Sequence, residues 1–151
     1  MINNILVATD GSEGALCAVQ YAAYLAKNLG SRVTLAHVVE PAASPLPLTA
    51  ISEEARRKFE EDLLDAGRAI IRLSQKPLAE AGIAANYEIL EGPPAETICQ
   101  YAEQNRFDLI IVGNRGRSKV SRVLLGSVSD EVIRKAYCPV MVIRQCSEDA
   151  R

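Results

Sequence analysis

Aromatic and metal-binding side chains are scarce in this sequence of 151 residues. It contains no tryptophan, two phenylalanines and a single histidine, His37. Aromatic rings usually surround a bound flavin, so this shortage argues against a flavodoxin-like redox protein. With one histidine and no Cys-x-x-Cys pair, the chain also lacks the residues of an ordinary zinc site. We expect reduced thiols, as in a cytoplasm, at the four cysteines Cys17, Cys99, Cys138 and Cys146.

Neither a strong net charge nor a long apolar run is present. The chain has 17 basic and 19 acidic residues and a formal net charge of −2, whereas general nucleic-acid binding needs a broad positive surface. No apolar run approaches the length that spans a membrane, and the chain starts without a charged and then apolar leader. We therefore expect a cytoplasmic protein without membrane insertion and without a nucleic-acid partner.

Recognisable catalytic machinery is missing too. The Gly-x-x-x-x-Gly-Lys-Ser/Thr loop that holds phosphates in many nucleotide hydrolases does not occur. His37 lies inside a predicted strand, where a structural imidazole is the favoured interpretation, and no other side chain is placed as a general base. We expect no catalytic residue, and at most very slow hydrolysis of a bound nucleotide.

Five short apolar runs alternate with four amphipathic segments. Near-continuous apolar runs are typical of parallel strands that are buried on both faces. The predicted strands are 2–9, 32–39, 84–90, 108–113 and 138–143, and the predicted helices begin near residues 12, 52, 94 and 127. This alternation predicts an α/β fold, a doubly wound five-stranded parallel sheet with helices on both faces. We expect one domain over residues 1–144 and a frayed tail over 145–151.

The longest amphipathic segment begins at Ser52; Pro77 is expected to kink or end this helix, and Gly82 is its latest end. Its apolar stripe is typical of a helix that covers a sheet. That stripe consists of Phe59, Leu63, Ala66, Ile70 and Leu73. The proline-rich stretch 41–52 before it is expected to be a loop that serves as a partner surface or flap.

The most informative stretch, 113–129, follows the fourth predicted strand. Glycine at 113 and 116 permits positive φ and removes the Cβ atoms that would keep a ligand from the main chain. After Gly126, Ser127 is expected to cap a helix whose free N–H groups face the same space. The stretch also carries basic side chains at Arg115, Arg117, Lys119 and Arg122. We interpret it as an anion site built from main-chain amides; the alternative is an ordinary helix cap beside a solvated basic loop.

Asp10 follows the first predicted strand and opens the turn Asp10-Gly11-Ser12. Doubly wound sheets bind ligands beyond the carboxyl ends of their strands, where the strand order reverses. There Asp10 would contact a sugar hydroxyl or a Mg²⁺ ion on the phosphates, because Mg²⁺ takes one or two protein carboxylates. The alternative is that Asp10 only forms an Asx-turn into Ser12.

The spacing Gly-x2-Gly-x9-Gly-Ser, the opening segment 4–12 and the pair His37-Val38 resemble the nucleotide-binding branch of the universal stress protein family. The resemblance covers nearly the whole chain and implies the strand order 3-2-1-4-5, ATP as the ligand and a role as a stress-response regulator. The candidate nucleotide contacts are Ala8, Thr9, Asp10, Val38, Val112, Gly113, Arg115, Gly116, Arg117, Gly126, Ser127, Val128 and Ser129. Family members commonly carry a small polar residue and a histidine after the first glycine, where this chain has Asn114 and Arg115.

The last predicted strand begins with Pro139, which favours a sheet edge. An exposed apolar edge is usually covered, and pairing with a second copy about a two-fold axis would cover it, as in the family. We expect a homodimer through Val140, Met141, Val142 and Ile143. The alternative function is therefore a dimeric interaction module of the same fold that binds no nucleotide. The sequence identifies neither the stress nor a downstream partner.

A bacterial receiver domain is a further alternative of the same fold class. Such a domain needs an acidic cluster at the first strand, whereas Asp10 stands alone. The sequence therefore argues against it.

Overall fold

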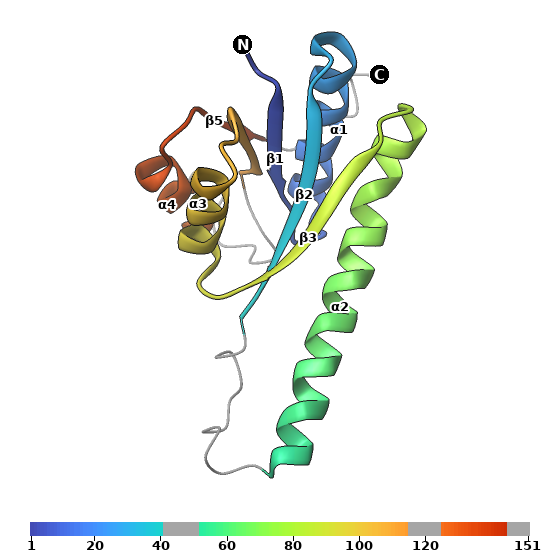
Figure 1. Cartoon of the computed structure of the whole chain (residues 1–151), viewed down its shortest axis with the longest axis vertical. Helices are drawn as coiled ribbons and strands as arrows, with labels where there is room; N and C mark the ends of the chain where they lie inside the picture. Colours follow the sequence, from blue (N-terminus) through green and yellow to red (C-terminus); the bar gives the residue numbers. More distant parts are fainter. Residues whose placement is uncertain (41–51, 115–124, 145–151) are drawn as a thin grey trace.

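A five-stranded parallel sheet with the order β3-β2-β1-β4-β5 forms the centre of the molecule (Figure 1). The computed structural model describes residues 1–40, 52–114 and 125–144. The strands are β1 (Asn4–Ala8), β2 (Arg32–Val39), β3 (Ala85–Glu91), β4 (Leu109–Gly113) and β5 (Val140–Ile143). Every neighbouring pair is parallel. The predicted fold class and strand order are confirmed.

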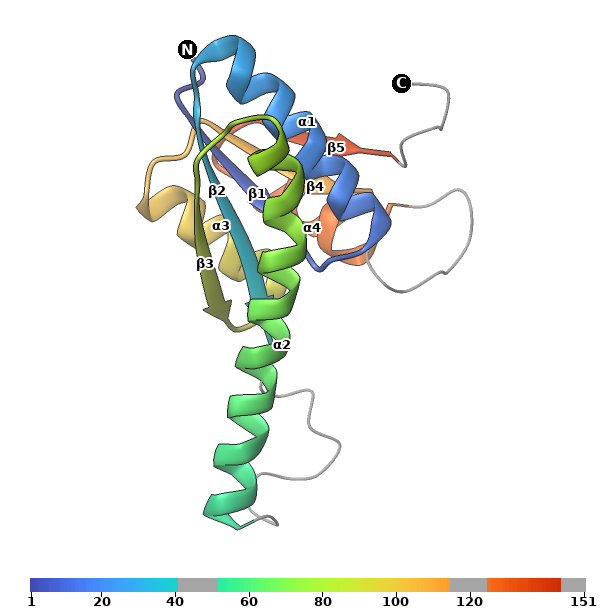
Figure 2. The same ribbon diagram turned by 90° about the vertical axis from the view of Figure 1, so that its right-hand side faces the viewer.

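Four helices cover the two faces of the sheet in the described part of the chain. They are α1 (Glu13–Leu29), α2 (Glu53–Glu80), α3 (Pro94–Gln104) and α4 (Ser127–Lys135). Successive strand side chains point to opposite faces, so Ile5 and Val7 join the core under α1 and α2, whereas Leu6 joins the core under α3 and α4. The views in Figures 1 and 2 show these two layers on either side of the sheet.

The central strands and the edge strand β3 differ in burial for a simple reason. β1 and β4 lie between two strands and two helix layers, so their apolar runs are almost wholly buried. β3 lies at an edge, and several of its side chains are exposed. Because an edge strand is only partly covered, its sequence need not be a continuous apolar run. This explains the weak apolar pattern of the predicted strand 84–90.

Helix α2 shares only Ile70 between its buried residues and the predicted stripe. It continues past Pro77 to Glu80, and Gly82 follows with a φ of 74°. Leu73 is 49% exposed. The buried residues of α2 are Gly67, Ile70, Ile71, Ser74 and Leu78, all in its second half. The first half extends away from the sheet (Figure 1).

The cysteines are not all reduced thiols. Cys17 is disulfide-bonded, whereas Cys99 and Cys138 are free. Burial raises the pKa of both free thiols, so they stay protonated at neutral pH. Within the described ranges, no helix is long and apolar enough to cross a membrane, and no cluster of His, Cys, Asp and Glu is arranged to hold a metal ion.

Candidate functional site

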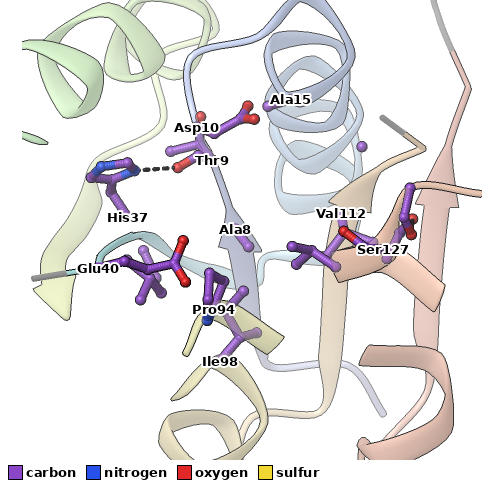
Figure 3. Close-up of a pocket in the computed structure, with 16 residues that line it drawn as sticks. Ala8, Thr9, Asp10, Ala15, His37, Glu40, Pro94, Ile98, Val112 and Ser127 are labelled. Carbon is purple, nitrogen blue, oxygen red and sulfur yellow. Dashed lines mark hydrogen bonds between the residues drawn. The ribbon is translucent and has the colours of Figure 1, made fainter. Parts of the chain in front are cut away.

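A cavity of about 280 Å³ lies at the carboxyl ends of β1, β2 and β4 (Figure 3). The strand order reverses between β1 and β4, so the cavity occupies the position where doubly wound sheets bind ligands. Its lining residues are Ala8, Thr9, Asp10, Ala15, Ala36, His37, Val38, Glu40, Pro94, Ile98, Val112, Gly113, Gly126, Ser127, Val128 and Ser129.

Every predicted site residue in the described part of the chain lines this cavity, from Ala8 on β1 to Ser129 on α4. The predicted contacts Arg115, Gly116 and Arg117 lie outside the described residues. Whether any of these residues contacts a nucleotide stays a prediction.

One wall of the cavity was missed by the sequence reasoning. Ala36, Pro94 and Ile98 supply apolar surface beside Val38 and Val112. Ala36 lies two residues before Val38, and the period of two along a strand therefore placed it on the same face. The position of Pro94 and Ile98 opposite β2 had no local signal, because it depends on how α3 crosses the sheet.

The main chain of Val38 offers a donor and an acceptor beside this wall. The β1–β2 ladder ends at the pair Ala8 and Ala36, and the amide of Thr9 donates to the carbonyl of Ala36 at 2.9 Å. The carbonyl of Val39 faces β3 instead and accepts from Gly92 at 3.0 Å. Because main-chain groups alternate along a strand, the N–H and C=O of Val38 face the side where β1 has ended. An adenine edge, with its amino group next to a ring nitrogen, complements such a pair.

The start of α4 lies on the other side of the cavity, and it differs from the prediction. Gly126, not Ser127, is the N-cap, and no side chain of the described residues caps the helix. The Gly126 amide donates to the Asn114 carbonyl at 2.8 Å, and the Asp130 amide makes the first helical bond, to the Gly126 carbonyl at 3.0 Å. The amides of the first turn therefore have no partner within the helix. Such amides, together with the helix dipole, are the groups that can bind an anion at a helix start, and here they lie at the cavity.

Ser129 keeps this arrangement in place. Its side chain is 3% exposed. The hydroxyl points at two carbonyl oxygens, that of Gly126 at 2.9 Å and that of Asn114 at 3.2 Å. This hydroxyl joins the end of β4 to the first turn of α4, so the residue is structural as well as part of the lining.

Gly113 has another role than the predicted one. It is not among the glycines with positive φ. A Cβ atom at Gly113 would lie 2.6 Å from the carbonyl carbon of Gly14 and 2.8 Å from the amide nitrogen of Ala15. The missing side chain therefore allows β4 to pack against the first turn of α1, and the expectation that it makes room for a ligand is wrong for this residue. Gly126 also has a negative φ, −64°.

Asp10 forms the predicted Asx-turn and also lines the cavity. Its Oδ1 atom accepts from the Ser12 amide at 2.9 Å, which is the Asx-turn. The same residue lines the cavity. Ser12 in turn caps α1, because its Oγ accepts from the Ala15 amide at 3.3 Å. The first turn of α1 is thus satisfied by the chain's own side chains.

His37 has the structural role that its place in a strand predicted. Its Nδ1 atom lies 2.8 Å from the Thr9 carbonyl oxygen (Figure 3). A carbonyl can only accept, so Nδ1 carries the hydrogen. The ring is held at the edge of the cavity by this bond.

Comparison with known proteins identifies the family. The model of the universal stress protein family matches residues 1–144. Universal stress protein MJ0531 of Methanocaldococcus jannaschii is 33% identical over 146 residues, which cover 96% of this chain and 84% of that protein. The solved structure of protein MJ0577 from the same organism has a TM-score of 0.83 and 28% identity, and the match covers 98% of this chain and 99% of that one.

Two more distant structures share the fold and contain nucleotides. A universal stress protein in complex with cAMP is 24% identical, with a TM-score of 0.68, and the match covers 95% of this chain and 98% of that one. A family protein from Arabidopsis thaliana with AMP bound is 21% identical, with a TM-score of 0.70, and the match covers 99% of this chain and 95% of that one. At these identities the two structures show the fold alone. From the family model and the similarity to MJ0531, the chain belongs to the universal stress protein family.

Proposed function

We propose that this protein binds ATP in the cavity between β1 and β4 and acts as a nucleotide-dependent regulator in a stress response. The observation that carries the proposal is the start of α4, which lies at the cavity with Gly126 as its N-cap and with no side-chain cap from the part of the chain that the structure describes. Family membership supports the regulatory role.

The cavity offers a separate partner for each part of an adenine nucleotide. The apolar wall and the main chain of Val38 suit the base, Asp10 suits the ribose, and the amides of Ser127, Val128 and Ser129 suit a phosphate. Each charge-assisted hydrogen bond contributes roughly 1.5–3 kcal/mol. Several of them, together with burial of the base, reach about −8 kcal/mol, which corresponds to a micromolar Kd.

Beyond the first phosphate, the proposal extends to groups outside the described residues. Gly116, Arg115 and Arg117 would contact the outer phosphates. The alternative role of Asp10 is to ligate a Mg²⁺ ion on the phosphates instead of the ribose, because Mg²⁺ takes one or two protein carboxylates and keeps phosphate oxygens and water in the rest of its shell. We propose binding with at most very slow hydrolysis.

Titration of the purified protein tests this function directly. Calorimetry with ATP, ADP, AMP and cAMP, and with GTP as the control, should give a micromolar Kd for ATP and much weaker binding of GTP. Mass spectrometry of the denatured protein should release a copurified adenine nucleotide. If none of the adenine nucleotides binds at millimolar concentration, the proposal is wrong, and the interaction module without nucleotide becomes the better account.

A homodimer through β5 is the second proposal. Among the described strands β5 pairs only with β4, and its residues Val140, Met141 and Val142 are half-buried at an open edge. Open apolar edges tend to recruit another strand. Sedimentation should give a dimer for the wild type and a monomer after Val142→Lys, whereas Tyr87→Lys on the opposite edge strand β3 should leave the dimer intact.

A further inference from the structure

We infer that Ser74 on α2 and His37 on β2 are positioning residues. Both form hydrogen bonds with Thr9, and through Thr9 they fix the turn that places the Asp10 carboxylate beside the ribose of the nucleotide. This inference rests on the proposed function and adds to it the part of the molecule that orients the sugar. It begins with Thr9, the residue between the end of β1 and Asp10.

The first hold on Thr9 is a buried bond between two hydroxyl groups. The Oγ1 atom of Thr9 lies 2.8 Å from the Oγ atom of Ser74, across 65 residues of sequence. Thr9 is 5% exposed, and Ser74 is fully buried. A buried hydroxyl is costly unless it is bonded, and among the hydrogen bonds of the described residues this is the one that the Ser74 hydroxyl makes. Ser74 therefore depends on Thr9 for its partner.

The second hold comes from His37. Its Nδ1–H donates to the Thr9 carbonyl at 2.8 Å. Gly67 on α2 leaves the space for the ring, because a Cβ atom there would lie 3.1 Å from the Cδ2 atom of His37. The Thr9 amide is bonded as well, to the carbonyl of Ala36 at 2.9 Å. All polar groups of Thr9 are therefore fixed by β2 and α2.

Thr9 is hydrogen-bonded in turn to the residue that follows Asp10 at the cavity. The amide of Gly11 donates to Thr9 Oγ1 at 3.2 Å, and the amide of Ser12 donates to Asp10 Oδ1 at 2.9 Å. Thr9 Oγ1 thus connects α2 to Gly11, one residue beyond Asp10. Without Ser74 the Thr9 side chain can rotate, and the Gly11 amide then loses its acceptor. The Asp10 carboxylate would sample a wider range of positions at the cavity.

Because coupling between two sites is reciprocal, the ligand should act back on α2. A nucleotide that fixes Asp10 also fixes Thr9, and it should therefore slow amide exchange in the second half of α2, around Ser74. The first half of α2, which extends away from the sheet and has no buried residue, should not respond.

The test compares Ser74→Ala with Ser31→Ala. Ser31 is also a buried serine, 8% exposed, but its hydroxyl bonds to the Ile2 carbonyl at the opposite end of the sheet. Calorimetry with ATP and 2′-deoxy-ATP separates positioning from a general loss of stability. We expect Ser74→Ala to weaken ATP binding by about fivefold or more, at the low end of couplings between linked sites. Binding of 2′-deoxy-ATP should change less than twofold, and Ser31→Ala should change neither.

His37 allows a rescue experiment in the same assay. His37→Leu removes the donor to the Thr9 carbonyl and should produce the same selective loss for ATP. His37→Asn keeps an N–H donor near the place of Nδ1 and should restore most of the affinity. If the two variants behave alike, the bond to Thr9 does not position the turn.

The outcomes separate this inference from the proposed function. If the wild type binds ATP but Ser74→Ala loses ATP and 2′-deoxy-ATP equally, or loses neither, the inference is overturned and the proposed function stands. If the wild type binds no adenine nucleotide, both fall. Amide exchange of Gly11 and Ser12 in the ligand-free protein gives a second measurement. It should accelerate at least about tenfold in Ser74→Ala relative to Ser31→Ala, and equal exchange would overturn the positioning.

Discussion

Helices α1 and α4 start at the same end of the sheet, beside the same cavity, but within the described residues only α1 is capped by side chains. Ser12 caps α1, and the Asp10 carboxylate holds the amide of Ser12 itself. At α4 the N-cap is Gly126, which has no side chain to accept from the first-turn amides. Uncapped amides at a helix start can bind an anion. The comparison therefore indicates that a phosphate would bind at the start of α4 rather than at the start of α1.

The largest expected effect comes from giving α4 a cap of its own. In Gly126→Asp the new carboxylate would occupy the first-turn amides and repel phosphate, so ATP affinity should fall about a hundredfold, or roughly 2.7 kcal/mol. Thermal unfolding should be unchanged or slightly higher, because aspartate is a better N-cap than glycine by a few tenths of a kcal/mol. Gly126→Asn, a cap without charge, is the control and should lose less affinity. Full affinity in Gly126→Asp would place the phosphate elsewhere.

The next effect concerns the close contact between Gly113 at the end of β4 and the first turn of α1. Gly113→Ala places a Cβ atom 2.6 Å from the Gly14 main chain, so the free energy of unfolding should drop by about 2 kcal/mol. Chemical denaturation measures this loss. Gly82→Ala is the matched control, since Gly82 has a φ of +74° but no atom within 4 Å of an added Cβ. It should cost only about 1 kcal/mol. Equal losses would show that Gly113 is not needed for close packing.

A smaller effect is expected when α1 loses its side-chain N-cap, Ser12. Ser12→Ala removes the acceptor of the Ala15 amide and should cost about 1 kcal/mol in the free energy of unfolding. Ser52→Ala removes the equivalent acceptor at the start of α2, where Ser52 Oγ accepts from Ala55 at 3.2 Å. That end of α2 extends away from the sheet, so the second variant should cost less. A larger loss in Ser52→Ala would mean that the first half of α2 contributes to the global fold.

The smallest effect is expected at the amino ends of β1 and β4, where the Asp108 carboxylate accepts from two main-chain amides. Asp108 Oδ2 accepts from Asn3 at 2.8 Å and from Asn4 at 2.9 Å, and these bonds lower the pKa of Asp108. A lowered pKa in the folded state stabilises the fold above the ordinary pKa of aspartate, and this contribution is lost as the pH falls through the folded value. Asp108→Asn should therefore be slightly less stable at neutral pH and should approach the wild type in acid. A difference that does not depend on pH would show that the charge contributes nothing.

Much of the cavity was accessible from the sequence because its parts are local. The apolar runs that end at Ala8, Val38 and Val112 predict strand ends, and strand ends meet at one edge of a parallel sheet. The stretch around Gly126 and Ser127 predicts a helix start. Each of these signals needs only a few neighbouring residues. For the same reason, the sequence reasoning assigned the cap to the wrong residue, because the choice between Gly126 and Ser127 depends on where the Asn114 carbonyl lies.

By itself, the sequence determined the order of strands and helices along this protein, the end of the sheet at which the cavity lies and most of the residues that line it. Only the tertiary structure decided why Gly113 is glycine, which half of α2 is packed, and that Ser74 meets Thr9. Contacts of this kind join residues far apart in the chain, and their geometry depends on how closely helices and strands approach one another. No periodicity or local spacing records that distance.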